Sequence, residues 1–199
     1  MSNTFDKIVE NRRSFYDISK EKVLEDDEII KLVEHAVKHT PSAYNSQTSR
    51  ALVLLDKAHD KLWDIVKSVL QERLSAERFV ATEQKLTAFQ KGYGTVLFFE
   101  EQNTIKAMQE QFSYAKDNFP LWSLQSSGML QYNVWLSLEA AGYGASLQHY
   151  NPIIDEKVHK AWDIPDSWKL WSQMPFGKPN SQPDAKDFLP LKDRIKVFK

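Results

Sequence analysis

The stretch WSLQSSGMLQYNVWLSLEAAGYG, residues 122–144, is the least polar long segment of the chain. Apolar side chains dominate it and polar ones occur only in patches, which predicts a long helix over most of its length. Ser126, Ser127 and Gly128 near its start are small enough to allow close packing against a neighbouring element. Gly142 and Gly144 favour the end of this helix, because glycine readily adopts the backbone conformations that terminate helices.

Helical and strand-like segments alternate along the rest of the chain. Further helices are expected at 3–14, with Asn3 or Thr4 as N-cap, and at 26–40, 58–74, 103–120 and 155–164, and a charged helical stretch runs on to about Gln90. Short apolar runs predict strands at 51–56, 92–101, 145–150 and 168–177. No repeat or linker interrupts this pattern, so we expect a single domain of mixed α and β structure over residues 1–199.

The composition excludes several classes of protein. The net charge of −1 gives no overall field that would attract nucleic acid or an acidic membrane. The chain has no cysteine, which excludes disulfides, thiol nucleophiles and zinc–thiolate sites. The charged N-terminus does not resemble a signal peptide, and no run approaches the ~18 apolar residues that span a bilayer, so we expect a cytoplasmic protein without a membrane partner.

Several common catalytic and binding motifs are absent. The chain has no GxGxxG, no GxxxxGK[ST] and no GxSxG, so nothing supports a Rossmann site, a P-loop or a hydrolase nucleophile. His35 and His39 stand four residues apart on one expected helix, the spacing of a metal-binding pair. No HExxH pattern accompanies them, and solvated surface histidines are the preferred interpretation, so we expect no metal site.

Four polar segments remain, and together they favour a composite ligand. They are RRS (12–14), PSAYNSQ (41–47), GYGASLQHYNP (142–152) and the tail cations Lys178, Lys186 and Arg194. Taken singly, they are typical of surface charges, a loop with Asx turns and a helix C-cap. Taken together, the guanidinium and hydroxyl groups suit a phosphate, the amides suit a polyol, and the glycines allow close approach to a flat ring. That description fits flavin mononucleotide, FMN.

The order RRSFY…PSAYNSQ…NVWLSLEAAGYGASLQHYNP…FGKP resembles the flavin-dependent nitroreductase family, and most closely its small nitroreductase-like members from bacteria and fungi. The resemblance runs from Asn11 to the C-terminus. It implies an α+β fold, a three-layer α-β-α sandwich with a mostly antiparallel central sheet. It also implies a homodimer with FMN at the interface and a C-terminal arm, residues 188–199, that extends onto the dimer partner.

The same resemblance implies roles for individual residues. Arg12 and Ser14 are expected to hold the FMN phosphate, with Arg13 at the phosphate or the ribityl chain. Asn45 and Gln47 are expected to contact the isoalloxazine or ribityl groups, with Ser42 and Ser46 as further candidates. The remaining expected cofactor-binding residues are Gln148, His149 and Tyr150, whose backbone faces the flavin N5 edge, and Lys186 near the phosphate.

Two positions depart from the family pattern. Phe188 stands where many members carry an arginine, so Arg194 is a candidate to supply that charge. Tyr16 stands at the last position of the family's RRSxR, where it replaces a basic residue near the flavin. Both departures concern contacts to the phosphate and the flavin rather than the identity of the cofactor.

The implied activity is that of an FMN-dependent oxidoreductase with NADH or NADPH as reductant and a small aromatic electron acceptor, a nitroaromatic or quinone, in a ping-pong cycle. The flavin N5 accepts hydride, so no catalytic side chain is expected. Tyr44, Phe98, Phe112 and Trp122 are candidates for pocket walls, with ordinary core as the alternative. A flavin-binding regulator of stress responses or lipid signalling, with little turnover, is the alternative function; a cofactor-free structural protein is a third.

Overall fold

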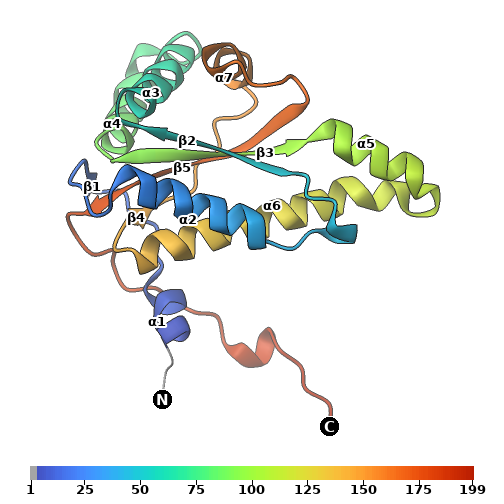
Figure 1. The fold of residues 1–199 in the computed structure, drawn as a ribbon. Coiled ribbons are helices and arrows are strands. Elements are labelled where there is room, and N and C mark those ends of the chain that lie inside the picture. The colour runs from blue at the N-terminus through green and yellow to red at the C-terminus, as the bar shows by residue number, and fades with distance from the viewer. Residues whose placement is uncertain (1–3) are drawn as a thin grey trace.

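The computed structural model describes residues 4–199 (Figure 1). The expected N-cap Asn3 lies outside the described residues. The helices are α1 (Thr4–Asn11), α2 (Asp26–His39), α3 (Asp56–Gln71), α4 (Ala76–Gln90), α5 (Gln102–Gln111), α6 (Phe119–Ala140) and α7 (Asp155–Trp162). The strands are β1 (Ile18–Ser19), β2 (Ser49–Leu55), β3 (Gly94–Glu101), β4 (Gly144–Ala145) and β5 (Trp168–Pro179). Short 3₁₀ turns occupy Ala43–Asn45 (η1), Ser113–Asn118 (η2) and Leu191–Asp193 (η3).

The strands form one antiparallel sheet in the order β1-β5-β3-β2, and β4 also pairs with β5. In the register of the central strands, Val96 of β3 lies between Val53 of β2 and Met174 of β5. Strand β5 is therefore the hub of the sheet, since β1, β3 and β4 all pair with it.

Two helical layers cover the two faces of this sheet (Figure 1). Side chains alternate between the faces along β3, as strand geometry requires. Leu97 and Phe99 pack in the core under α3, α4 and α7. Val96 and Phe98 pack in the second core, under α2 and α6. The predicted α+β class, with a central antiparallel sheet between helical layers, is confirmed.

The boundaries of several elements differ from the predictions. The helix expected at 103–120 is broken: α5 ends at Gln111, and η2 separates it from α6. Pro120 explains where α6 begins, because proline is tolerated in the first turn of a helix and disrupts a helix interior. The first helix is shorter than expected and ends at Asn11, which leaves Arg12 and Arg13 outside it.

The strand expected at 145–150 is also wrong in extent, because β4 stops at Ala145. Beyond it, Gln148 makes only an isolated bridge with Gln173. Two residues further on, the backbone N–H of Tyr150 donates to the side-chain Oε1 of Gln173 at 2.7 Å. A side chain thus replaces the backbone partner that a continuous strand would need.

Helix α6 ends as its glycine predicts. Gly142 has a φ of +89°, which L side chains rarely adopt, and the N–H of Tyr143 bonds back to Leu138 at 2.9 Å. One side of α6 is buried against the fold and includes Ser126, Ser127 and Leu130. Its opposite side carries exposed apolar residues: Leu121, Leu124, Met129 and Tyr132. We call this side, together with Gly128 between them, the outer face of α6.

The C-terminal tail leaves the sheet and runs away from the helical layers (Figure 1). Its large apolar side chains are exposed: Phe188, Leu189, Leu191, Ile195, Val197 and Phe198. In the described part of the chain no helix is both long and apolar enough to cross a bilayer.

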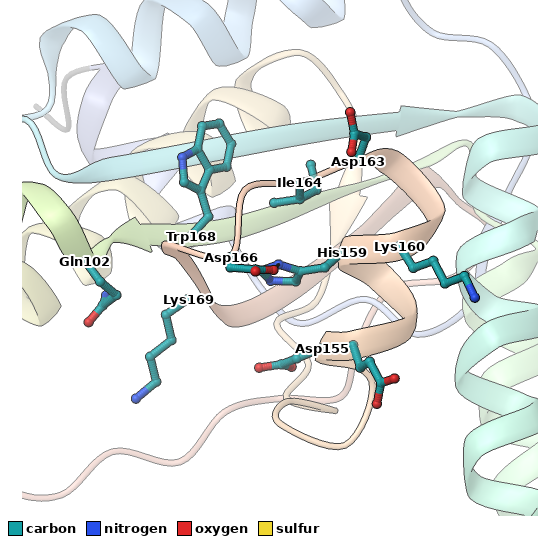
Figure 2. A pocket seen from close by; sticks show the side chains of 10 residues that line it. Gln102, Asp155, His159, Lys160, Asp163, Ile164, Asp166, Trp168 and Lys169 are labelled. Carbon is teal, nitrogen blue, oxygen red and sulfur yellow. Dashed lines mark ion pairs between the residues drawn. The ribbon is translucent and has the colours of Figure 1, made fainter.

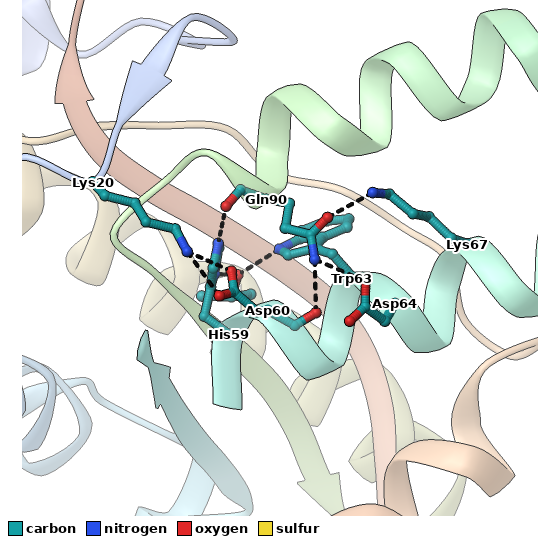
Figure 3. A network of polar contacts seen from close by, with 8 residues as sticks. Lys20, His59, Asp60, Trp63, Asp64, Lys67 and Gln90 are labelled. Atoms are coloured by element: carbon teal, nitrogen blue, oxygen red, sulfur yellow. Dashed lines mark hydrogen bonds and ion pairs between the residues drawn. The ribbon is translucent and has the colours of Figure 1, made fainter. Parts of the chain in front are cut away.

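A buried polar network joins α3, α4 and β3 (Figure 3). Trp63 donates its indole N–H to the Thr95 hydroxyl at 3.1 Å, so that hydroxyl donates in turn to Nδ1 of His59 at 2.8 Å. The Nε2–H of His59 donates to the Gln90 carbonyl at 3.2 Å. Every ring nitrogen of a neutral His59 is therefore satisfied, and burial lowers its pKa to about 4.

This histidine predicts a loss of stability in mild acid. Its pKa is lower in the folded protein than the ordinary 6.5, so the unfolded chain binds the extra proton first and stability falls as pH drops below 6.5. Between pH 6.5 and 4.5 we expect the free energy of unfolding to fall by roughly 2–3 kcal/mol, at ~1.36 kcal/mol per unit. Urea unfolding across this range measures it.

The matched variants are His59→Gln and His35→Gln. His59→Gln is expected to flatten the pH dependence, whereas His35→Gln, at an exposed histidine of α2, is expected to keep it. An unchanged slope in His59→Gln would mean that other groups cause the acid sensitivity.

Candidate functional site

The segment that follows α1 is fixed beside the sheet. Ser14 forms a parallel bridge with Ala145, and the N–H of Phe15 donates to the Ala145 carbonyl at 3.0 Å. These bonds hold Arg12, Arg13 and Ser14 next to β4. The bonds to Ala145, and not the geometry of α1, therefore fix the positions of Arg12 and Arg13.

The tail returns to the same place from the far end of the chain. Asn180 binds Asp17 twice, by its backbone N–H at 3.0 Å and by its side-chain amide at 2.8 Å. Arg13 donates to the backbone carbonyl of Asp184 at 2.6 Å. Lys186 is thereby brought next to the segment after α1.

A cavity of about 500 Å³ opens between these two segments. We call it the Arg12–Lys186 cavity. Three cationic side chains and one carboxylate line it, so its charge favours an anion. Its lining residues are Arg12, Arg13, Ser14, Tyr16, Pro183, Asp184, Ala185 and Lys186. The structure thus brings together four of the residues expected at the phosphate.

Arg12 is held on α6. Its guanidinium carbon lies 4.4 Å from the centre of the Trp135 ring, a cation–π contact. Its Nε is buried and has no hydrogen-bond partner in the described chain. A buried donor without a partner costs free energy, so this atom suits an oxyanion. Glu139, half-buried nearby, has its pKa raised by burial, and the charge of Arg12 opposes that rise.

The loop 41–47 has an unusual backbone. Tyr44, Asn45 and Gln47 have φ values of 55°, 51° and 48°, the left-handed region that non-glycine residues seldom occupy. The Ser42 hydroxyl accepts the backbone N–H of Gln47 at 2.9 Å and closes the loop. Strain of this kind persists only where surrounding contacts hold it, and it concentrates at functional sites.

Aromatic residues supply contacts that hold this loop. The Tyr44 ring lies 4.7 Å from Phe112, 5.6 Å from Phe119 and 6.0 Å from Trp122, measured between ring centres. Three of the four aromatic wall candidates therefore meet here, at the start of α6. Phe98 does not, because it is fully buried in the core under α2 and α6.

The residues after β4 have different surroundings. The N–H of Gln148 donates to Gln173 at 2.7 Å, and its side-chain amide donates to Ser146 at 3.1 Å. Tyr150 packs edge-on against Trp63 at 5.9 Å, and burial raises its pKa to about 12. His149 is exposed, and its backbone N–H has no partner in the described chain. Of these three residues, only His149 offers a free backbone donor.

The two tail cations are placed differently. Lys186 lines the Arg12–Lys186 cavity, with its Nζ 5.3 Å from the centre of the Phe188 ring. Arg194 follows η3, where its backbone N–H bonds to Leu191 at 3.0 Å, and it does not line that cavity. The part expected of Arg194 stays a prediction.

Within one chain, the two halves of the expected site lie far apart. Loop 41–47 contacts Trp122, near the start of α6, and Arg12 contacts Trp135, further along the same helix. These tryptophans are thirteen residues apart, which is about 20 Å at ~1.5 Å per residue. A single chain does not bring Asn45 and Gln47 to the Arg12–Lys186 cavity.

A second cavity, of about 670 Å³, lies beside α7 and contains none of the expected site residues (Figure 2). Asp166 lies next to His159 there, 4.0 Å from its Nδ1, and Asp155 has a buried oxygen without a partner. Among residues 4–199, no group of three or more histidine and carboxylate side chains could hold a metal ion. We assign no function to this cavity.

Three residues near the candidate site were missed by sequence reasoning. Trp135 and Glu139 are four residues apart, one helical turn, on the side of α6 that receives Arg12, and this spacing was the available signal. Tyr114 reaches the Tyr44 hydroxyl from η2. Its position depends on the break before α6, so no local pattern marks it.

Known proteins resemble this chain over most of its length. The sequence profile described as Nitroreductase family matches residues 9–178. Nitroreductase FRM2 of Saccharomyces cerevisiae is 31% identical over 183 residues, 91% of each chain. Nitroreductase CinD from Lactococcus lactis, solved with chloramphenicol, superposes with a TM-score of 0.91 at 43% identity over 98% of this chain and 100% of its own. CinD solved with 4-nitrophenol gives 0.90 and 44%, with the same coverage.

The loop geometry predicts the effect of removing its closing bond. Ser42→Ala is expected to lower the free energy of unfolding by about 0.5–1.5 kcal/mol, the usual net value of one hydrogen bond, because Gln47 loses its acceptor. Hydrogen exchange of the Gln47 amide is expected to speed up. Ser46→Ala, in the same loop, is the control, since no hydrogen bond of the Ser46 hydroxyl is present in the described chain. Equal effects of the two substitutions would contradict the assignment.

Proposed function

Because this chain belongs to the nitroreductase family and is an oxidoreductase of that type, we propose that it uses FMN with NADH or NADPH to reduce nitroaromatics, quinones or related small aromatic acceptors in a ping-pong cycle. The observation that carries the proposal is the Arg12–Lys186 cavity, which Arg12, Ser14 and Lys186 line together, with a buried unpartnered Nε on Arg12.

This cavity fits the phosphate end of FMN. Arg12 and Lys186 supply opposite charge, and Ser14 supplies a hydroxyl donor, the groups that bind phosphate most strongly. One guanidinium nitrogen of Arg13 donates to the Asp184 carbonyl, and this bond holds the tail in place. The remaining guanidinium nitrogens of Arg13 are available to the phosphate or the ribityl chain.

Two copies of the chain would complete the site. Gly128 lies midway between Trp122 and Trp135 on the outer face of α6, and a Cβ there would meet nothing within 4 Å. If two α6 helices cross at Gly128 in antiparallel directions, loop 41–47 of one copy comes beside the Arg12–Lys186 cavity of the other. This crossing also removes the exposed apolar outer face from water. We therefore propose a homodimer with two shared sites.

The C-terminal arm supports the same proposal. Its exposed apolar side chains alternate with cations and make few contacts with their own chain. A surface of the second copy is the occupant that would bury them. We propose that residues 188–199 lie on the partner, which would carry Arg194 there as well.

FMN, when bound, supplies the hydride acceptor and donor of the reaction. The chain's part is to orient it and to exclude competing contacts. The free backbone N–H of His149 is the donor we assign to the N5 edge, since the N–H groups of Gln148 and Tyr150 are already used. Asn45 and Gln47 contribute amides from the strained loop, with Ser42 as its brace.

The acceptor class is supported by the solved relatives. CinD has been solved with chloramphenicol and with 4-nitrophenol, which are both nitroaromatic compounds. The aromatic group around Tyr44 offers flat surfaces to such rings.

An absorbance spectrum of the purified protein, before and after anaerobic NADH or NADPH, tests the proposal. We expect the bands of oxidised flavin, which bleach on addition and return with a nitroaromatic acceptor. A flavin that neither reductant bleaches would favour the regulator. A colourless protein that FMN cannot reconstitute would overturn the cofactor assignment.

Arg12→Ala is expected to weaken FMN binding by ten-fold or more, because a charge-assisted bond to phosphate contributes roughly 1.5–3 kcal/mol. Fluorescence titration of the apoprotein with FMN measures the dissociation constant. Arg78→Ala, an exposed arginine on α4 in the opposite helical layer, is the control and is expected to bind FMN normally. Unchanged affinity for FMN in Arg12→Ala would contradict the assignment of the phosphate to this cavity.

Gly128→Leu is expected to separate the dimer without unfolding the chain. Leucine has open space at this position in a single chain and favours helix over glycine by about 1 kcal/mol, but it would clash at a helix crossing. Sedimentation velocity and circular dichroism together measure assembly and fold. Lys106→Leu, at an exposed position of α5, controls for added surface hydrophobicity. A Gly128→Leu protein that stays dimeric would rule out this crossing.

A further inference from the structure

Two tyrosine hydroxyls meet at the edge of the aromatic group beside loop 41–47. The oxygen atoms of Tyr44 and Tyr114 are 2.9 Å apart. Both side chains are exposed, Tyr44 to 52% and Tyr114 to 78%, so a ligand can reach both hydroxyls from solvent. The two residues come from segments seventy positions apart, η1 and η2, and the contact is therefore a product of the fold.

The rings behind these hydroxyls are held in place. Tyr44 lies nearly parallel to Trp122, at an interplanar angle of 27°, and Tyr114 stands edge-on to Phe112 at 86°. Beneath them Ile105, Ala115 and Phe119 form a small buried core between α5, η2 and α6. The hydroxyls are thus presented from a fixed aromatic base rather than from mobile side chains.

The backbone of Tyr44 supports a specific role for its side chain. Its φ of 55° is unfavourable for a tyrosine, and glycine would avoid that cost. The contacts of its ring with Phe112 and Trp122 offset the strain. The chain therefore places an aromatic residue where the local backbone alone would favour glycine.

The pair always retains one free donor. Each phenol has one O–H and two acceptor lone pairs, and one phenol donates to the other. The receiving phenol keeps its own O–H for another partner. The bond to Tyr44 also raises the pKa of Tyr114, which keeps its proton in place at neutral and mildly alkaline pH.

We propose that Tyr44 and Tyr114 are specificity-determining residues that recognise an aromatic acceptor carrying an oxygen substituent. The ring of the acceptor packs on the aromatic group, and the free phenolic O–H donates a hydrogen bond to a hydroxyl or carbonyl oxygen of the acceptor other than the group that is reduced. The inference rests on the proposed function, because it names the substrate class of that same site. The side chains select and orient the acceptor and take no part in electron transfer.

The test compares two acceptors of equal size in the FMN-loaded full-length protein. Para-nitrobenzyl alcohol carries a hydroxyl where para-nitroethylbenzene carries a methyl group, and both are uncharged. The double substitution Tyr44→Phe with Tyr114→Phe removes both hydroxyls and is expected to raise KM for the alcohol about 2- to 12-fold, the loss of one hydrogen bond, with kcat nearly unchanged. KM for the ethyl compound is expected to stay the same. Either single substitution leaves one O–H free to bond the acceptor, so each alone is expected to change KM for the alcohol less than the double substitution.

Ser113→Ala is the matched control, since it removes an exposed hydroxyl next to Tyr114 and is expected to change neither KM. Equal changes for both acceptors, or none, in the protein that carries both substitutions would overturn the inference. Bleaching of the flavin by NADH or NADPH in the same preparations distinguishes failure of this inference from failure of the proposed function. If the flavin still bleaches but KM does not change as expected, only the acceptor assignment is wrong. If the wild-type protein neither binds flavin nor turns over either acceptor, the proposed function and this inference fail together.

Discussion

The hydrogen bonding of strand β5 is the constraint on which most of the candidate site depends. Its pairing with β4 places Ala145 beside Ser14, and its pairing with β1 turns the tail back toward Arg13. Gln173 in the middle of the strand fixes Gln148 by its backbone and Tyr150 by its side chain. One strand therefore sets the relative positions of three segments that are widely separated in sequence. A substitution that shifted its register would move all three together.

Loop 41–47 obeys a different constraint. It is attached to the first turns of α6 by aromatic contacts, and its left-handed residues depend on those contacts. The helix thus carries one half of the site at each end: Trp122 supports the loop and Trp135 supports Arg12. The proposed homodimer would account for this arrangement, because it would cover the apolar outer face of α6 and bring opposite ends of two helices together.

Much of the fold was predictable because its signals are local. The continuous apolar run of β3 identifies a buried strand, the mainly apolar stretch of α6 identifies a long helix, and Gly142 marks the helix end. Convergence of Arg12 and Lys186 was expected only through the family resemblance, since no local pattern links residues so far apart. Pro120 was a local signal for the start of α6 that the predicted helix 103–120 did not use, whereas the early end of β4 depends on the Gln173 side chain, which no local pattern reveals.

Helix α6 has a consequence for how this protein can vary. Loop 41–47 contacts Trp122, and Arg12 contacts Trp135. The length of helix between these two tryptophans therefore sets the distance between the two groups of expected site residues. One inserted or deleted residue would rotate everything beyond it by about 100° and shift it by ~1.5 Å along the axis. Apart from Trp122, Gly128, Trp135 and the buried residues, side chains along this stretch are expected to be exchanged more freely than its length can be changed. Variation among proteins built this way is therefore expected in the loops and the arm, while the helical spacing is kept.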